Sequence, residues 1–313
     1  MKTAIIAVGG NALTKKDDDG NIYQQFANAR ETCAKLIKVV EMGYDIIITH
    51  GNGPQVGDSI RRHEHARKII PPYPLGVCVA ETVGSMGYML QQTMQNTVKK
   101  SKVVRKDTVT IITQVVVDDD DPSFKNPTKP IGQFFSKEEI EEIAKTEKWA
   151  VVEDSGRGWR RVVPSPKPLR IVEKDTIGDL LSKGKIVIAC GGGGLPVIQL
   201  EDGTLDGVEA VIDKDYASSK LAQQLDLDEL IILTAVDKVS INFGKPDQVD
   251  LDILTVKEAR KHLKDGQFPP GSMGPKIDAA IQFIENGGRR AIIASYENLV
   301  EAMKGEAGTR IVR

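Results

Sequence analysis

The amino-acid sequence predicts an α/β protein, a three-layer αβα sandwich in which helices cover both faces of a mostly parallel sheet. Three observations support this prediction. Short apolar and β-branched runs recur along the chain, helical stretches separate them, and three of the runs end abruptly in glycines. A strand that is apolar along its whole length is typical of a parallel sheet, because helices bury both of its faces.

The first two predicted strands each run into a glycine loop. Residues 3–8 (TAIIAV) break into 9–11 (GGN), and residues 44–49 (YDIIIT) break into 50–54 (HGNGP). Between them, residues 24–42 place apolar side chains at helical spacing and are followed by a glycine, which predicts one long helix. The order of strand, loop, helix and strand favours parallel pairing.

Three further strands are predicted later in the chain. Residues 185–190 (KIVIAC) end in four glycines at 191–194, and the other two strands are expected at 230–233 (LIIL) and 291–294 (AIIA). In open α/β sheets, ligands bind beyond the carboxyl ends of the parallel strands. We therefore expect the three glycine clusters to lie at a binding site.

The middle of the chain, residues 118–170, has a different composition. It contains six prolines, four consecutive aspartates at 118–121, and the stretch DSGRGWRRVVPSPKP at 154–168. Residues 136–148 begin with a serine cap and predict a helix. We interpret 118–170 as a small inserted subdomain within one domain spanning 1–313, and the aspartate run as a solvated loop rather than a metal site.

The composition excludes several functional classes. The 313 residues include 42 Lys and Arg against 44 Asp and Glu, a net charge of -2, without the basic, aromatic-rich stripe of a nucleic-acid-binding protein. Apolar runs fall short of the ~20 residues of a membrane span, and the apolar stretch at the start is too short for a secretory signal, so a cytoplasmic location is expected.

Cysteine and histidine usage disfavours disulfide and zinc chemistry. The three cysteines, an odd number, are scattered, and Cys190 is expected to be a small buried apolar residue. Among the four histidines, His63 and His65 are close in sequence, but two residues apart on a helix they point to different sides. We interpret them as part of a solvated helix face.

Glycine loops after strands predict anion binding, because glycine lets backbone N–H groups approach a phosphate closely. The clusters do not continue into G-K-[ST], which excludes a P-loop, and Gly51, Gly53 and Gly57 miss the G-x-G-x-x-G spacing. A tight turn remains the alternative for any single loop, and a dinucleotide-binding enzyme remains a minor alternative for the whole chain.

Two lysines stand where a helix alone disfavours them. Pro275 suits the first turn of a helix in 271–288, so Lys276 lies at its N-terminus, and Lys214 opens another helix beside Asp215. Cations are favoured at the opposite, C-terminal end of a helix. Free N–H groups and an ammonium together bind phosphate well, so we interpret both positions as candidate phosphate sites.

Six separated motifs, read in order, resemble the carbamate kinases of the amino-acid kinase family. The resemblance covers essentially the whole chain and implies the αβα fold, a homodimer, a place in arginine metabolism, and reversible phosphoryl transfer between MgATP and carbamate. The expected direction in the cell is formation of ATP from carbamoyl phosphate. The motifs are GGNAL at 9–13, THGNGPQVG at 49–57, NPTKPIG at 126–132, DSGRGWRRVVPSPKP at 154–168, VIDKD at 211–215 and GSMGPK at 271–276.

The resemblance also implies the roles of individual residues. Lys129, Lys214 and Lys276 are the reacting-phosphate lysines, and Asp215 holds lysines in place. Other amino-acid kinases carry a lysine where this chain has Val8, and Lys129 is expected to supply the missing charge from the inserted subdomain. Mg²⁺ is expected on the nucleotide phosphates, without a protein metal site. The substrate-side residues are Gly9, Gly10, Asn11, Gly51, Asn52 and Gly53, and the nucleotide side comprises Lys214, Thr234, Asp237, Ser272, Met273, Gly274 and Lys276.

Two alternatives stay open at this point. One is another acyl kinase of the same fold, such as an acetylglutamate kinase, which would need a pocket for a substrate side chain. The other is a non-catalytic nucleotide-sensing domain. Carbamate is already an anion at neutral pH and needs no general base. The lack of a candidate catalytic histidine is therefore consistent with the resemblance to carbamate kinases.

Overall fold

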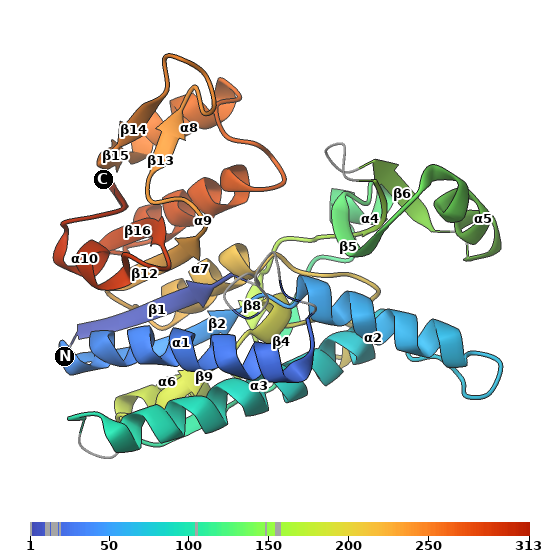
Figure 1. Cartoon of the computed structure of the whole chain (residues 1–313), viewed down its shortest axis with the longest axis horizontal. Coiled ribbons are helices and arrows are strands. Elements are labelled where there is room, and N and C mark those ends of the chain that lie inside the picture. Colours follow the sequence, from blue (N-terminus) through green and yellow to red (C-terminus); the bar gives the residue numbers. More distant parts are fainter. Residues whose placement is uncertain are drawn as a thin grey trace.

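The computed structural model describes residues 2–9, 13, 18, 20–103, 106–147, 149–153 and 158–313. An eight-stranded sheet forms its centre (Figure 1), in the order β15-β17-β16-β12-β1-β2-β9-β3. Six neighbouring strands run parallel: β1 (Lys2–Val8), β2 (Tyr44–His50), β3 (Thr108–Thr110), β9 (Ile186–Ile188), β12 (Glu229–Thr234) and β16 (Arg290–Ser295).

At one edge of the sheet the direction changes. Strand β17 (Thr309–Val312) pairs antiparallel with β16, and β15 (Ile253–Thr255) pairs parallel with β17. The predicted mostly parallel α/β sheet is therefore confirmed, with one reversed edge that the sequence analysis did not foresee.

The central strand β1 faces two separate cores. Ile5 and Ala7 pack into one hydrophobic cluster, whereas Ala4, Ile6 and Val8 pack into the other, and all five side chains are fully buried. This two-sided burial explains why residues 4–8 are all apolar, rather than every second one.

Helices cover both faces and complete three layers. On one face lie α1 (Ile22–Glu41), α3 (Leu75–Lys100) and α10 (Leu299–Lys304). On the other lie α6 (Lys174–Ser182), α7 (Lys214–Gln224), α8 (Val256–Lys264) and α9 (Met273–Glu285). None of the helices in the described ranges is long and apolar enough to cross a membrane.

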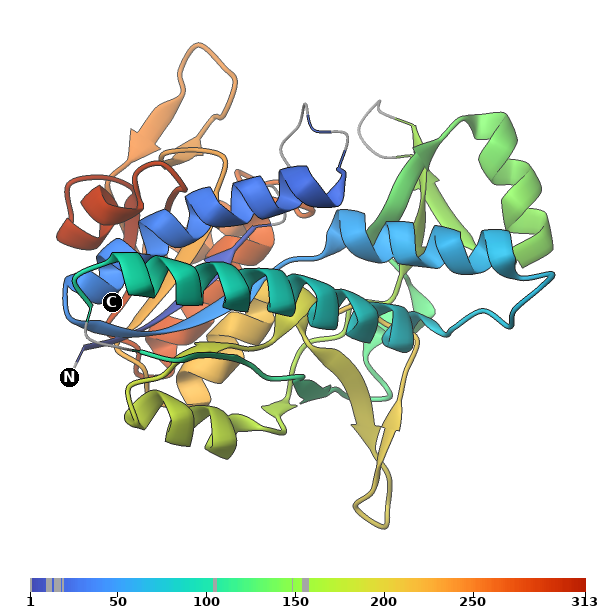
Figure 2. The same cartoon turned by 60° about the horizontal axis from the view of Figure 1, so that its bottom comes forward.

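A small three-stranded sheet stands apart from the main sheet, in the order β5-β7-β6 (Figure 1). It falls within the stretch that the sequence set apart. Figure 2 shows α2 (Gly53–Ala66) running alongside this unit, and α2 packs against β5. The unit comprises β5 (Lys129–Phe135), β6 (Ala150–Glu153), β7 (Trp159–Val163) and α5 (Lys137–Glu147), with α4 (Pro122–Lys125) before it.

The described residues form two further small sheets. One has the order β11-β10-β4-β8 and the other pairs β13 with β14. A short 3₁₀ turn, Gly191–Gly193, follows β9. The strands are β4 (Gln114–Val116), β8 (Arg170–Ile171), β10 (Leu195–Gln199), β11 (Leu205–Gly207), β13 (Val239–Ile241) and β14 (Val249–Leu251).

Candidate active site

The carboxyl ends of β1, β2 and β9 bring the glycine loops to one edge of the sheet. The N–H of Gly51 donates to the carbonyl of Val8 at 3.0 Å, which ties the loop after β2 to the end of β1. Gly9 is half-buried there, whereas Gly10 and Asn11 lie outside the described residues.

The loop after β9 packs directly on the residues that follow β2. A side chain at Gly191 would come within 2.6 Å of His50 Nε2, and one at Gly192 within 2.4 Å of Asn52 Nδ2. Asn52 is buried, and its side-chain amide donates to Thr82 Oγ1 of α3 at 2.8 Å. Glycine is therefore required after β9 because these loops leave no room for a Cβ atom.

Two lysines from different helices meet at one carboxylate. Lys214 Nζ lies 2.5 Å from Asp215 Oδ1, and Lys276 Nζ lies 2.9 Å from Asp215 Oδ2. Asp215 is buried in the first turn of α7, and Lys276 belongs to the first turns of α9. The structure thus brings together the two helix N-termini that the sequence analysis selected separately.

The third lysine comes from the small sheet. Lys129, the first residue of β5, places Nζ 2.5 Å from Asp213 Oδ2. Asp213 is the N-cap of α7, and its other oxygen accepts from the N–H of Asp215 at 2.9 Å. Asp213 was not predicted as a site residue, although an aspartate directly before a predicted helix is a recognisable N-cap signal.

Burial and ion pairing act in opposite directions on the pKa values of this cluster. Burial raises the pKa of Asp213, but the charges of Lys129 and Lys214 outweigh burial and hold that pKa well below its usual range. Burial also lowers the pKa of Lys276, but pairing with Asp215 raises its net pKa above the ordinary value. For Lys214, burial wins over the attraction of Asp215, and its pKa is lowered.

The cluster carries an excess of positive charge. Three lysines face two aspartates, so these five side chains have a formal charge of +1 when all are ionised. Glycine-lined loops end at the same edge of the sheet. Such a site favours an anion with several oxygens, and phosphoryl groups fit that description.

The expected nucleotide-side residues occupy two places. Thr234 is half-buried at the end of β12, while Asp237 accepts from Asn298 Nδ2 at 2.8 Å and is exposed. Ser272 and Met273 begin α9. The N–H of Gly274 already donates to the carbonyl of Pro269 at 2.9 Å, so this amide is not a free anion donor.

Cys190 is buried, as expected, and the aspartate run lies in an exposed loop. Cys190 is fully buried, and its backbone adopts a left-handed conformation with a φ of 48°. Strand β9 ends at Ile188, two residues earlier than predicted. Asp118, Asp119 and Asp120 are exposed, and their carboxylates lie close enough together to hold a metal ion. Asp121 caps α4 by accepting from the N–H of Ser123 at 2.8 Å.

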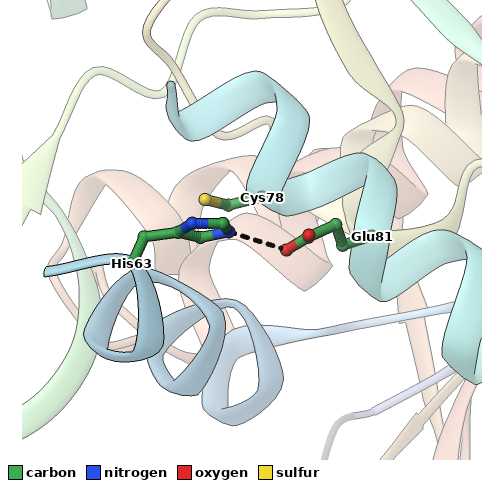
Figure 3. Close-up of side chains that lie close together, drawn as sticks. All are labelled: His63, Cys78 and Glu81. Atoms are coloured by element: carbon green, nitrogen blue, oxygen red, sulfur yellow. Dashed lines mark hydrogen bonds and ion pairs between the residues drawn. The ribbon is translucent and has the colours of Figure 1, made fainter. Parts of the chain in front are cut away.

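A second polar group lies between α2 and α3 (Figure 3). His63, Cys78 and Glu81 present atoms close enough together to hold a metal ion. However, Glu81 Oε2 already accepts from Ser59 Oγ at 2.5 Å and lies 3.2 Å from His63 Nε2. Burial raises the pKa of the Cys78 thiol, which disfavours the thiolate that a metal needs. We interpret the group as a contact that joins the two helices. His65 does not belong to the group and is exposed.

Comparison with known proteins places the chain among enzymes of phosphoryl transfer. It belongs to the amino acid kinase family, whose model matches residues 2–295. It is 48% identical to "Carbamate kinase" of Thermococcus kodakarensis over 100% of both chains, and 48% identical to "Carbamate kinase" of Clostridium perfringens over 99% of both. The structure of "Carbamate kinase from Giardia lamblia bound to AMP-PNP" is 41% identical, covers 99% of this chain and 98% of its own, and superposes with a TM-score of 0.91.

Proposed function

We propose that this protein is a carbamate kinase, which catalyses reversible phosphoryl transfer between ATP and carbamate. The observation that carries the proposal is the double ion pair at Asp215, which holds Lys214 and Lys276 side by side at two helix N-termini. Full-length relatives that carry the name carbamate kinase support the same reaction.

The chemistry requires placement and charge stabilisation rather than a general base. A carbamate oxygen attacks the γ-phosphorus of ATP in line, the bond to the β–γ bridging oxygen breaks, and ADP and carbamoyl phosphate form. Because carbamate is an anion, two negatively charged reactants must be held together. Lys214 and Lys276 bind the phosphoryl group in flight, and Lys129 lies on the side of the attacking oxygen.

A magnesium ion fits this site if nucleotide phosphates hold it. The two carboxylates of the cluster, Asp213 and Asp215, are both engaged by lysines. Bound Mg²⁺ would neutralise charge on the β- and γ-phosphates. Thr234 and the start of α9 at 272–274 border the nucleotide, and the loops at 9–11 and 51–53 border carbamate.

We further propose a cytoplasmic homodimer in which residues 118–170 form a subdomain that closes over the site. The three cysteines are free and buried, which suits a reducing compartment. Lys129 supports the closing role, because it reaches Asp213 from the small sheet.

The decisive assay supplies ADP, Mg²⁺ and carbamoyl phosphate and measures ATP. We expect robust ATP formation, and none from acetyl phosphate or N-acetylglutamyl phosphate. Lys276→Ala should lower turnover at least ~100-fold, by analogy with the loss of one preorganised donor. Lys174→Ala is the matched control, because Lys174 opens α6 beside Asp175 at the surface.

The outcomes separate the alternatives. ATP formation from acyl phosphates would instead indicate another acyl kinase of this fold. Unchanged turnover in Lys276→Ala would contradict the role assigned to Lys276. Nucleotide binding without turnover in the wild type would favour a nucleotide-sensing domain.

A further inference from the structure

Helix α2 and strand β5 touch through their backbones at two glycines. A Cβ atom on Gly57 would lie 2.4 Å from Gly132 Cα and 3.0 Å from Gly132 N. A Cβ atom on Gly132 would instead lie 3.8 Å from Gly57 Cα, which is an ordinary van der Waals contact. Gly132 has a φ of +74°, which favours glycine for a separate reason. The contact therefore tolerates no side chain on Gly57.

This contact lies between the two halves of the proposed site. Gly57 follows Gly53, the first residue of α2, by about one helical turn, roughly 6 Å along the axis. Gly132 follows Lys129 by three residues of strand, roughly 10 Å. One backbone contact thus joins the helix that follows the substrate-side loop to the strand that carries Lys129.

Neighbouring side chains hold the contact in place. Ile131 is buried in a small cluster with Val56 and Ile60 of α2, the residues that flank Gly57 on the same face. Arg160 of β7 donates to the carbonyl of Gly132 at 2.9 Å. The strand is therefore fixed on the helix by packing on one side and by a hydrogen bond on the other.

We propose that Gly57 is a positioning residue, which seats β5 on α2 through Gly132 and thereby fixes Lys129 against Asp213 for phosphoryl transfer. This inference rests on the proposed function. A methyl group on Gly57 forces β5 outward, because backbone atoms at 2.4 Å cannot stay in place. A displacement of about 1 Å at a catalytic group lowers the rate by as much as ~100-fold.

The test begins with Gly57→Ala in the assay with ADP, Mg²⁺ and carbamoyl phosphate. We expect kcat to fall about 10-fold to 100-fold, because Lys129 is misplaced. The KM for ADP should stay within about twofold, since Lys214 and Lys276 are untouched. Gly84→Ala is the matched control, because a side chain on this exposed glycine of α3 meets open space. A wild-type kcat in Gly57→Ala would overturn the proposal.

A double-mutant comparison separates positioning from general damage. If Gly57 acts through Lys129, then Gly57→Ala should have no further effect in a Lys129→Ala protein. Losses that multiply in the double variant would overturn the proposal and assign Gly57 a structural role. A wild-type rate in Lys129→Ala would instead overturn the role of Lys129 in the proposed function.

A second variant covers the case in which Gly57→Ala does not fold. Ile131→Ala loosens the same contact from the strand side, and its thermal unfolding shows whether the main sheet is intact. We expect a lower kcat that is again non-additive with Lys129→Ala. An Ile131→Ala protein that folds and keeps the wild-type kcat would contradict the proposal.

Discussion

At the scale of single residues, the site depends on one carboxylate between two ammonium groups. Without Asp215, Lys214 and Lys276 would repel each other across a largely buried space, and burial already lowers the pKa of Lys214. An ion pair of this kind is therefore important for placing charge.

The first prediction concerns Asp215→Asn, which keeps the shape of the side chain and removes its charge. We expect kcat for ATP formation to fall at least ~100-fold, because both lysines lose their preorganised position. Steady-state kinetics measure the effect. Asp175→Asn is the matched control, since Asp175 follows Lys174 in the same way at an exposed helix start. Equal effects of the two substitutions would contradict the assigned role.

His50 offers a second prediction at this scale, on the stability of the fold. Burial lowers the pKa of His50 to about 4. In the unfolded chain the pKa of this histidine is about 6.5. Between that pH and about 4, the imidazole is therefore protonated in the unfolded state but neutral in the folded state. The stabilisation is fully present above pH 6.5 and is lost as the pH falls toward 4. The free energy of unfolding should decrease by about 2 kcal/mol from this group between pH 7 and pH 5.

Urea unfolding at the two pH values measures this effect. His50→Asn should remove that part of the pH dependence, whereas His65→Asn should keep it, because His65 is exposed. The same pH slope in His50→Asn and in the wild type would contradict the assignment.

At the scale of elements, the loop after β9 sets where α7 begins. A Cβ atom on Gly193 would lie 2.1 Å from the carbonyl oxygen of Ile212, the residue before the N-cap Asp213. Gly193 also has a φ of +94°. The loop and the start of α7 therefore hold each other in position, and with them the lysine cluster.

The third prediction is that Gly193→Ala destabilises the protein by about 3 kcal/mol or more, from backbone strain together with overpacking. Its activity should also fall, because the start of α7 must move. Urea unfolding and the ATP assay measure the two effects. Gly207→Ala in β11 should change neither, because its side chain meets open space. A small, equal effect of both substitutions would show that the loop does not position α7.

The elements differ in how far the sequence could predict them. Strands β1 and β2 were predicted within one residue at each end, because both of their faces are buried and each contains a continuous apolar run, at 4–8 and 46–48. The short strands β13 and β14 were missed, since three residues are too few to show a strand periodicity. The pairing of Lys129 with Asp213 joins residues 84 positions apart, and no local pattern encodes it.

At the scale of the whole molecule, the sandwich and the small sheet differ in how much they bury. The main sheet has a hydrophobic core on each face. Among the described residues of the small sheet and α5, the buried apolar ones are few by comparison: Ile131, Ile140, Val162 and Val163. Regions with few buried apolar contacts open at a lower free energy than the rest of a protein. We therefore expect the small unit to open without unfolding of the sandwich.

The last prediction follows from this difference. In hydrogen exchange measured by mass spectrometry, β1 and β12 should exchange by global unfolding alone, while β5 and β7 should exchange at least ~10-fold faster. Adding ADP, Mg²⁺ and carbamoyl phosphate should slow exchange in β5, because Lys129 then bridges the small sheet to the bound anion. Lys129→Ala should lose this protection, whereas Lys125→Ala should keep it, since Lys125 is exposed at the end of α4. Equal ligand protection in both variants would mean that Lys129 does not close the small sheet over the site.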